Sequence, residues 1–118
     1  METVRRVSPE RKGTGMTTYE DVQRFKALAD PTRLTLLQII SRGDGLLNVI
    51  DLREKLNVQL GRRLSQPTIS HHLGILRDAR LVDSTKDGLE AFYRLRSDAL
   101  TCAMEVLRTI ARRQEVAV

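Results

Sequence analysis

The sequence predicts a mainly α-helical fold with about five helices and a two-stranded β-hairpin between the fourth helix and the last. In five segments apolar residues recur at the spacing of a helix face, and residues suited to helix starts precede them. Two further segments, Leu81–Thr85 and Glu90–Leu95, read as strands, and Asp87-Gly88 between them is a strong hairpin signal. Two helices joined by a short connection and followed by a hairpin form the order of a winged helix-turn-helix.

Length and composition fit one compact domain. The 118-residue chain is 41% hydrophobic and 30% charged, which is ordinary for a single globular domain. Its apolar runs fall far short of the roughly 20 residues that cross a membrane. Residues 1–16 contain Pro9 and no apolar stretch, so we do not expect them to act as a signal peptide. We therefore expect a flexible basic arm over residues 1–16, a winged-helix domain over residues 17–118, and a cytoplasmic location.

The first two helices are separated by Asp30-Pro31. The first helix is expected to begin at Thr17 or Thr18, and its apolar face consists of Val22, Phe25, Leu28 and Ala29. Asp30 can cap the second helix, which accepts Pro31 in its first position because that N–H has no partner in a helix. The second helix is expected to be nearly all core. Its apolar residues are Leu34, Leu36, Leu37, Ile39 and Ile40.

A capping signal also places the third helix. Asn48, with Asp51 three residues later, predicts a helix over about Val49–Leu56. The sequence after it, residues 57–64, contains Gly61 and two arginines and is harder to interpret. These residues either extend the third helix or form a mobile loop.

The fourth and last helices begin at serine residues. Ser65, followed by Pro67 in the first turn, predicts the start of the fourth helix. Its buried side is expected to consist of Ile69, Leu73 and Leu76. The last helix is expected from Ser97 to about Arg113. Its apolar stripe consists of Leu100, Ala103, Met104, Leu107, Ile110 and Ala111.

The positive charge of the chain is concentrated in two segments. The formal net charge is +5, and the sequence pI is near 10.0. Residues 62–96 hold seven basic side chains against four acidic ones, and residues 1–15 hold four against two, whereas the rest is balanced. This distribution suits a polyanionic partner, although it also occurs on a merely solvated face. Because the chain has four aromatic residues and no Trp, stacking of single-stranded bases is disfavoured.

The fourth helix carries short hydrogen-bonding side chains near its N-terminus, namely Gln66, Thr68, Ser70 and His71. Gln can pair with adenine through two hydrogen bonds, Ser and Thr reach several base edges, and a helix N-terminus attracts phosphate. We therefore predict that this helix reads double-stranded DNA in the major groove. The expected phosphate contacts are Arg62, Arg63, Arg77, Lys86 and Arg94. Arg62 and Arg63 either grip the DNA backbone or are simply solvated.

Two sequence motifs resemble the ArsR/SmtB family of bacterial repressors. The first is Phe25–Leu34, and the second is Leu64–Leu73 followed by Leu76–Val82. Tyr93-Arg94-Leu95 resembles the second strand of the family's wing, and the resemblance spans about residues 19–113. It implies a homodimeric winged-helix regulator of transcription that binds an operator in double-stranded DNA, usually as a repressor released by an inducer.

The resemblance also implies dimerisation through the first and last helices. The apolar faces of these helices exceed what the core of one small domain should need, so we expect them to pair subunits. The expected interface residues are Val22, Phe25, Leu100, Met104 and Leu107.

The positions at which the family's metal sensors hold metal carry other residues in this chain. Some of those sensors have two cysteines at the start of the third helix, where this chain has Asn48 and Ile50; others use Asp and His on the last helix, which lacks His here. Zinc and arsenic need converging thiolate or imidazole ligands. His71 and His72 are adjacent and point about 100° apart on a helix, so they cannot hold one ion together. We expect no metal and no cofactor, and an inducer of unknown identity.

Two alternatives to this function stay open. The wing tip, residues 86–90, is less basic than is usual in the family, which leaves a winged-helix protein–protein interaction module without DNA specificity as a rival. Cys102, the single cysteine, is either an inert small residue or one half of a thiol pair between subunits that makes the repressor redox-responsive. An enzyme is not expected, because the sequence shows no nucleophile–base pair, paired carboxylates or glycine-rich phosphate loop.

Overall fold

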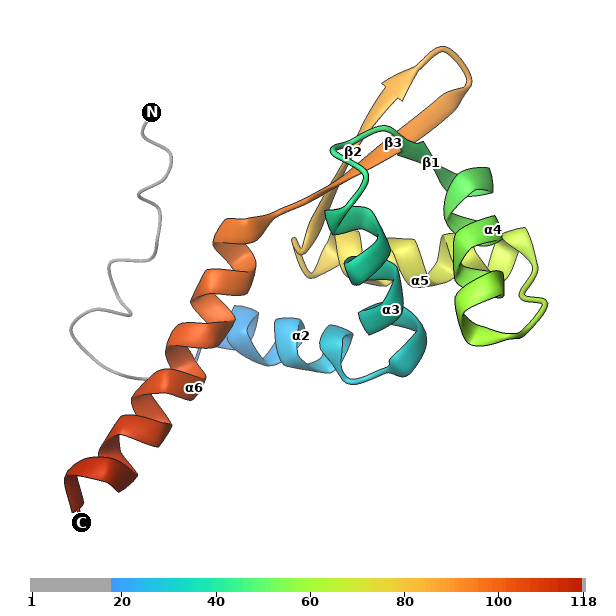
Figure 1. The fold of residues 1–118 in the computed structure, drawn as a ribbon. Coiled ribbons are helices and arrows are strands. Elements are labelled where there is room, and N and C mark those ends of the chain that lie inside the picture. Colours follow the sequence, from blue (N-terminus) through green and yellow to red (C-terminus); the bar gives the residue numbers. More distant parts are fainter. Residues whose placement is uncertain (1–17, 118) are drawn as a thin grey trace.

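The computed structural model describes residues 18–117, with side chains as far as Arg113 (Figure 1). The expected arm, residues 1–16, lies outside the described residues. Within them the chain forms five helices and a three-stranded antiparallel sheet of order β1-β3-β2. The elements are α2 (Tyr19–Leu28), α3 (Pro31–Ser41), β1 (Leu47–Asn48), α4 (Val49–Leu60), α5 (Gln66–Asp78), β2 (Val82–Asp87), β3 (Glu90–Leu95) and α6 (Ser97–Ala117). The predicted helical fold with a hairpin wing is confirmed.

Local capping interactions fix the helix starts that the sequence predicts. At α2, Thr18 Oγ1 accepts a hydrogen bond from the Asp21 N–H (3.1 Å), and the Asp21 carboxylate accepts one from the Thr18 N–H (2.9 Å). Asn48 and Asp51 form the same reciprocal box at α4, and Ser65 caps α5. Because these caps satisfy N–H groups that a helix leaves without partners, they hold each start in place.

One hydrophobic core lies between α3, α4, α5 and the base of the sheet. Its fully buried large side chains are Leu36, Ile40, Leu52, Leu56, Ile69, Leu73, Leu76, Leu81 and Val82. Asp30 caps α3 as predicted, accepting a hydrogen bond from the Arg33 N–H (3.0 Å). The prediction that α3 is nearly all core is wrong at Leu34, which is 44% exposed. Leu34 and the buried Leu36 point roughly 200° apart around the helix, so they cannot face the same core.

The wing is a hairpin of β2 and β3 with a short third strand beside it. β2 begins one residue later and ends two residues later than predicted, whereas β3 occupies the predicted residues. β1, which the sequence pattern does not indicate, pairs Leu47 with Tyr93 and Asn48 with Phe92 on the other edge of β3. Two residues are too few to show the alternation by which a strand is identified.

The segment predicted to connect the third and fourth helices, residues 57–64, is helical as far as Leu60. Its remaining residues form a loop that hydrogen bonds from α4 hold in place. α4 runs four residues beyond its predicted end and is closed by Gly61, whose φ of +65° costs glycine nothing. The Asn57 side chain then holds Leu64 twice: Oδ1 accepts from the Leu64 N–H (2.9 Å), and Nδ2 donates to the Leu64 carbonyl (3.3 Å). Arg53 Nε donates to the same carbonyl (2.9 Å). α4 itself therefore sets where α5 begins.

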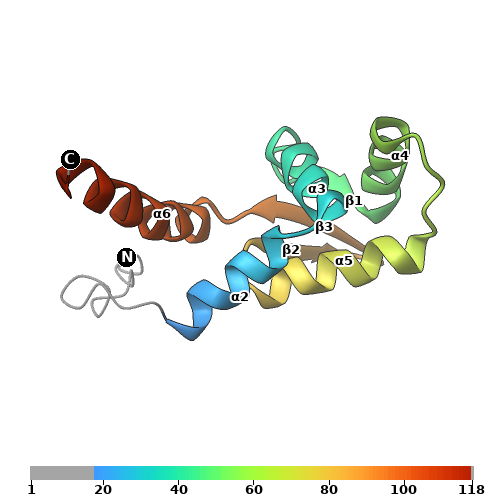
Figure 2. The ribbon, with the colours of Figure 1, turned by 90° about the horizontal axis from the view of Figure 1, so that it is seen from below.

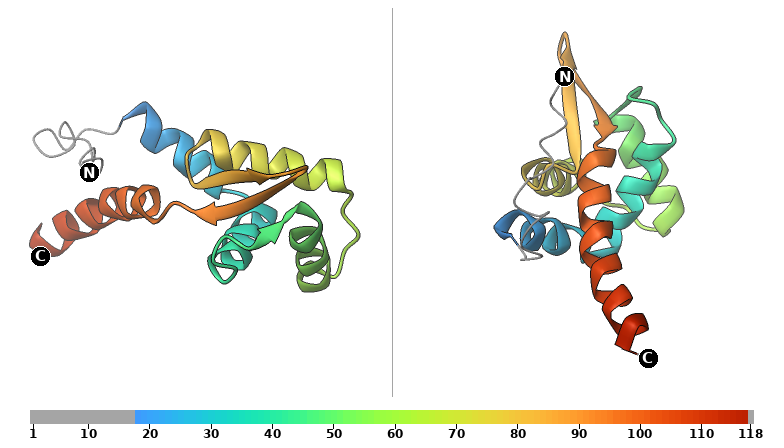
Figure 3. Two further views of the ribbon diagram at one scale, coloured as in Figure 1. Left: turned by 90° about the horizontal axis from the view of Figure 1, so that it is seen from above. Right: turned by 90° about the vertical axis from the view of Figure 1, so that its left-hand side faces the viewer.

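α2 and α6 lie side by side at one end of the molecule, away from the tip of the wing (Figure 1). α6 continues past the body of the domain (Figure 2). α5 lies on one side of the domain and α3 and α4 on the other (Figure 3). No helix within residues 18–117 is long and apolar enough to cross a membrane.

Candidate nucleic-acid interface

α5 has one exposed polar face and one buried apolar side. Gln66, Ser70 and His71 are exposed. The side facing the core consists of Ile69, Leu73 and Leu76, as predicted. Thr68 is half-buried, and its hydroxyl lies 3.0 Å from the hydroxyl of the capping Ser65. Three of the four predicted base-reading residues are thus exposed, whereas the Thr68 hydroxyl is engaged at the cap.

Two of the predicted phosphate-binding cations lie at the start of α5. Arg62 and Arg63 are exposed in the loop between α4 and α5. The N-terminus of a helix carries the positive end of its dipole, so this end of α5 favours a phosphate in two ways. Arg77 is also exposed but lies 11 residues beyond Gln66, which is about 16 Å along the helix. The structure therefore does not bring Arg77 to this end.

The two predicted wing cations lie on opposite faces of the hairpin. Lys86 pairs with Ala91, and Arg94 pairs with Asp83. Residues paired across an antiparallel sheet share a face, and side chains alternate along each strand, so pairs three residues apart face opposite ways. The Arg94 guanidinium also lies so close to Gly45 that a Cβ at that position would be 2.5 Å from it. The wing thus presents one cation toward its tip and another, on the other face, near its base.

Arg96, at the base of the wing, is engaged in ion pairs within the fold. Its guanidinium lies 2.9 Å from the Asp98 carboxylate and 3.6 Å from that of Asp83. The hydrogen bond from Arg96 lowers the pKa of Asp98, and the same bond raises the pKa of Arg96. Although Arg96 belongs to the basic segment, its charge is therefore largely balanced locally.

Hydrogen bonds of Arg33 connect α5 with the junction between α2 and α3. His71 is exposed and His72 is half-buried. Burial lowers the pKa of His72, which contacts Arg33. Arg33 also donates to the carbonyls of Ala27 (2.7 Å) and Lys26 (3.3 Å) at the end of α2. This role of Arg33 could not be predicted from the sequence, because no local pattern indicates a partner 39 residues along the chain.

α2 and α6 leave several apolar side chains exposed. The most exposed are Tyr19, Val22, Met104, Leu107 and Ile110, and the other predicted interface residues, Phe25 and Leu100, are half-buried. The inner side of α2 instead carries an ion pair between Arg24 Nη1 and Asp21 Oδ1 (3.2 Å). Tyr19 and Ile110 extend this exposed apolar surface beyond the five expected interface residues.

The described residues contain no group of three or more His, Cys, Asp or Glu side chains placed to hold a metal ion. The rings of His71 and His72 are tilted by 58°, with 5.8 Å between their centroids. Cys102 is half-buried on α6 and forms no disulfide within the chain.

Comparison with known proteins points to one family. Residues 30–84, from the α3 cap into β2, match the family described as "Bacterial regulatory protein, arsR family". The biofilm growth-associated repressor of Agrobacterium fabrum is 36% identical over 86 residues, which are 73% of this chain and 67% of that protein. The crystal structure of an ArsR family transcriptional regulator has a TM-score of 0.66 at 26% identity, covering 86% of this chain and 95% of the other. A homodimeric winged helix-turn-helix DNA-binding domain from Mycobacterium bovis has a TM-score of 0.55 at 24% identity, covering 83% and 78%.

Proposed function

This chain belongs to the arsR family of bacterial regulatory proteins, and from that membership we propose that it is a homodimeric repressor that reads its operator with α5. Proteins of this family are DNA-binding regulators of transcription. The observation that carries the role of α5 is its division into an exposed polar face and a fully buried apolar side. Such a helix can enter the major groove without exposing the core of the domain.

Base contacts are assigned to the exposed face of α5. The amide of Gln66 suits adenine, and the hydroxyl of Ser70 can donate to or accept from several base edges. His71 lies next to Ser70 and is exposed. Thr68 contributes chiefly its methyl group, which suits the methyl group of thymine, because its hydroxyl is held at the cap.

Phosphate contacts are assigned to the cations around this helix. Arg62 and Arg63 take phosphates beside the start of α5, and Arg77 takes one beyond its far end. Lys86 and Arg94 contact different phosphates, since they lie on opposite faces of the wing. Contacts of this kind place the protein on the duplex without selecting its sequence.

The dimer is assigned to the apolar residues that α2 and α6 leave uncovered. The proposed interface consists of Val22, Phe25, Leu100, Met104 and Leu107, with Tyr19 and Ile110 at its margins. Removing such side chains from water is favourable by about 25 cal/mol per Å² of apolar area. The homodimeric state of the Mycobacterium bovis domain supports this assembly. A two-fold dimer presents two copies of α5, so the operator should be palindromic, with half-sites roughly 34–36 Å apart.

The inducer is proposed to be something other than a metal ion at the positions that the family's metal sensors use. Asn48 Oδ1 caps α4, and its Nδ2 donates to Glu90 Oε1 (3.1 Å), so both atoms have structural roles. Ile50 offers no ligand atom. We also propose that the protein works in the cytoplasm as a regulator and not as an enzyme.

Selection of duplexes from a random pool, followed by titrations at several salt concentrations, tests this function. A repressor should enrich a palindromic site and bind it more tightly than random duplex. Its affinity should also fall steeply with salt, because neutralised phosphates release counterions. Binding with no preferred sequence and no salt dependence would identify a protein-docking module instead. Non-reducing electrophoresis of oxidised protein would reveal a redox-responsive repressor through a dimer linked at Cys102.

A further inference from the structure

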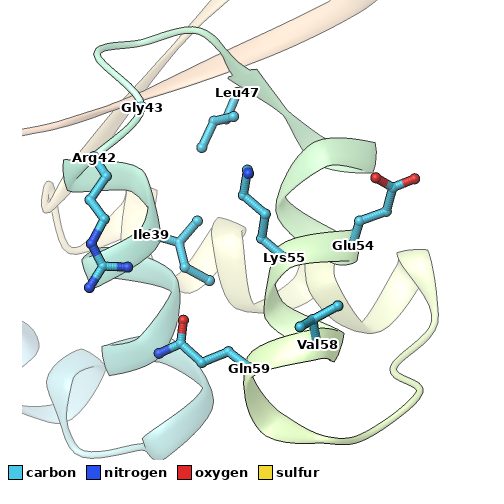
Figure 4. Close-up of a pocket in the computed structure, with 8 residues that line it drawn as sticks. All are labelled: Ile39, Arg42, Gly43, Leu47, Glu54, Lys55, Val58 and Gln59. Atoms are coloured by element: carbon cyan, nitrogen blue, oxygen red, sulfur yellow. The ribbon is translucent and has the colours of Figure 1, made fainter.

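A groove of about 740 Å³ lies between α3 and α4 (Figure 4). Ile39, which is 3% exposed, lies deep between the two helices, and Leu47 and Val58 add apolar walls. Val58 is 82% exposed, so the apolar lining reaches the rim and is open to solvent. Such a lining favours a ligand with an apolar body, because burying apolar surface removes it from water.

Two cations border this apolar lining. Lys55 directs its ammonium group into the space between the helices, below Leu47, and Arg42 lines the α3 side (Figure 4). Glu54 points away from that space in the same view. Among the residues that the structure describes, neither the Arg42 nor the Lys55 side chain has a hydrogen bond or ion pair. Both positive charges are therefore available to a ligand.

The combination of an apolar wall and two available cations selects one class of ligand. A metal ion would be repelled by both cations, and a neutral apolar molecule would leave them unused. A highly charged polyanion gains nothing from Ile39 and Val58. A carboxylate on an apolar body uses both features, since charge-assisted hydrogen bonds hold the carboxylate while the body covers the apolar wall.

The groove also touches the parts of the chain that position the DNA-binding elements. Leu47 belongs to β1, which pairs with Tyr93 in the wing. Lys55 and Val58 belong to α4, whose Asn57 fastens the start of α5 at Leu64. α3 and α4 lie across the domain from the exposed side of α5, so a ligand there leaves that side open to DNA (Figure 3). A ligand that spreads α3 and α4 would thus shift α5 and the wing relative to each other.

We propose that this groove binds a small organic carboxylate with an apolar body, and that its occupancy changes the affinity of the protein for operator DNA. The first half concerns the groove alone. The second half rests on the proposed function, and names the chemical class of its inducer or co-repressor.

A fluorescence titration of the full chain without DNA tests the binding half. The probe is dansyl-undecanoic acid, and its methyl ester is the neutral counterpart. The acid should saturate at one molecule per protomer, and the ester should bind at least about tenfold more weakly. Lys55→Met and Val58→Glu should each lower the affinity for the acid by about tenfold. Lys55→Met removes a cation, and Val58→Glu places a negative charge at the exposed rim, where it repels the carboxylate.

Lys26→Met is the matched control, since Lys26 is an exposed lysine on α2, away from the groove. It should bind the acid like the unmodified protein. The proposed site would be overturned if the acid and the ester bind equally, or if the acid shows no saturable binding. It would also be overturned if Lys55→Met and Val58→Glu both bind the acid as tightly as the unmodified protein.

Operator affinity with and without saturating probe tests the regulatory half. We expect saturating probe to change the operator affinity of the wild type by at least about fivefold, and Val58→Glu should abolish this change. If the acid binds in the groove and the operator affinity stays the same, the regulatory half is overturned. If the protein selects no duplex at all, the proposed function fails, while the DNA-free titration still decides the groove.

Discussion

The Arg33 guanidinium and Nδ1 of His72 lie 3.2 Å apart, although 39 positions separate the two residues. Arg33 can only donate, so Nδ1 of His72 accepts and the ring proton sits on Nε2. Because the same guanidinium donates to the last carbonyls of α2, one side chain fastens α5 to the end of α2. The bond requires a neutral imidazole, since a protonated Nδ1 has no lone pair to offer.

Stability should therefore fall in mildly acidic solution. Burial lowers the pKa of His72 below its usual 6.5, so the unfolded chain takes up a proton that the native state resists. The stabilising contribution is complete above about pH 6.5 and is lost as the pH falls toward the lower native pKa. His72→Asn keeps an acceptor near Nδ1 but does not titrate. Denaturant titrations should show a free energy of unfolding that changes less for this variant than for the wild type between about pH 7.5 and pH 5.5.

His71→Asn is the matched control for this measurement. His71 is the neighbouring histidine but is exposed, and its charge is the weakest of the influences on the pKa of His72, so its replacement should preserve most of the wild-type pH dependence. If His72→Asn and the wild type change in parallel over the whole interval, His72 does not carry the pH dependence.

Replacing Gln66 or Ser70 by Ala should weaken binding to the operator by about 1–3 kcal/mol and to random duplex by much less. Both side chains lie on the exposed face of α5, where base edges would be read. Gln38→Ala removes a glutamine that is exposed on α3, and it should leave both affinities unchanged. Fluorescence anisotropy with labelled duplexes measures both affinities for the wild type and each variant. Unaltered operator preference in both α5 variants would show that another element reads the DNA.

Lys86→Met should weaken operator and random duplex alike and flatten the log–log dependence on salt by roughly one unit. Arg94→Met should do the same. Because the two side chains lie on opposite faces of the wing, the double variant should lose roughly two units of slope. A loss confined to the operator would mean that the wing contributes to sequence recognition.

Leu107→Glu should convert the dimer into monomer in sedimentation experiments at micromolar concentration. Leu107 is 56% exposed on α6, and a carboxylate buried in an apolar interface has no partner there. Leu89→Glu adds the same charge at the tip of the wing, where the side chain is fully exposed, and should remain dimeric. A wild-type chain that sediments as a stable monomer at this concentration would refute the proposed interface.

Zinc should not bind tightly to the purified protein in a chelator-competition assay. The atoms of Asn48 are occupied by capping and by Glu90, and the described residues gather no other ligand set. Zinc that binds stoichiometrically and also releases DNA would show that a metal site has formed from other residues.

The helix starts and the hairpin are predictable because their causes are local. The side chains of Asn48 and Ser65 each accept a hydrogen bond from the N–H three residues later. The hairpin turns locally at Gly88-Leu89, one residue later than the Asp87-Gly88 signal suggests, because Asp87 pairs with Glu90. By contrast, β1 exists only because Leu47 meets Tyr93 on a distant strand. The exposure of Leu34 likewise depends on which side of α3 the other helices cover.

In the candidate site, too, the features with local causes are predictable from the sequence and those that depend on packing are not. The exposure of Ser70 and His71 follows from helical periodicity, since both lie off the stripe of buried residues. Gln66 lies above that stripe and is exposed as the first residue of the helix. The contact between Arg33 and His72 depends on how whole helices pack, which no short pattern encodes. Which cations lie close together depends on the register of the hairpin and the length of α5. The structure was therefore needed to show that Arg77 and Arg62 lie at opposite ends of α5.

Among residues 18–117, β2 has a neighbouring strand on one side only, since β1 takes the far side of β3. An unpaired strand edge is a template on which other chains can assemble, and folded proteins guard such edges with charged side chains. Three of the six residues of β2 are charged, namely Asp83, Lys86 and Asp87. These charges discourage edge-to-edge aggregation between wings. Lys86 is therefore expected to favour solubility at high concentration in addition to its proposed contact with phosphate, and an apolar replacement there should make the protein less soluble.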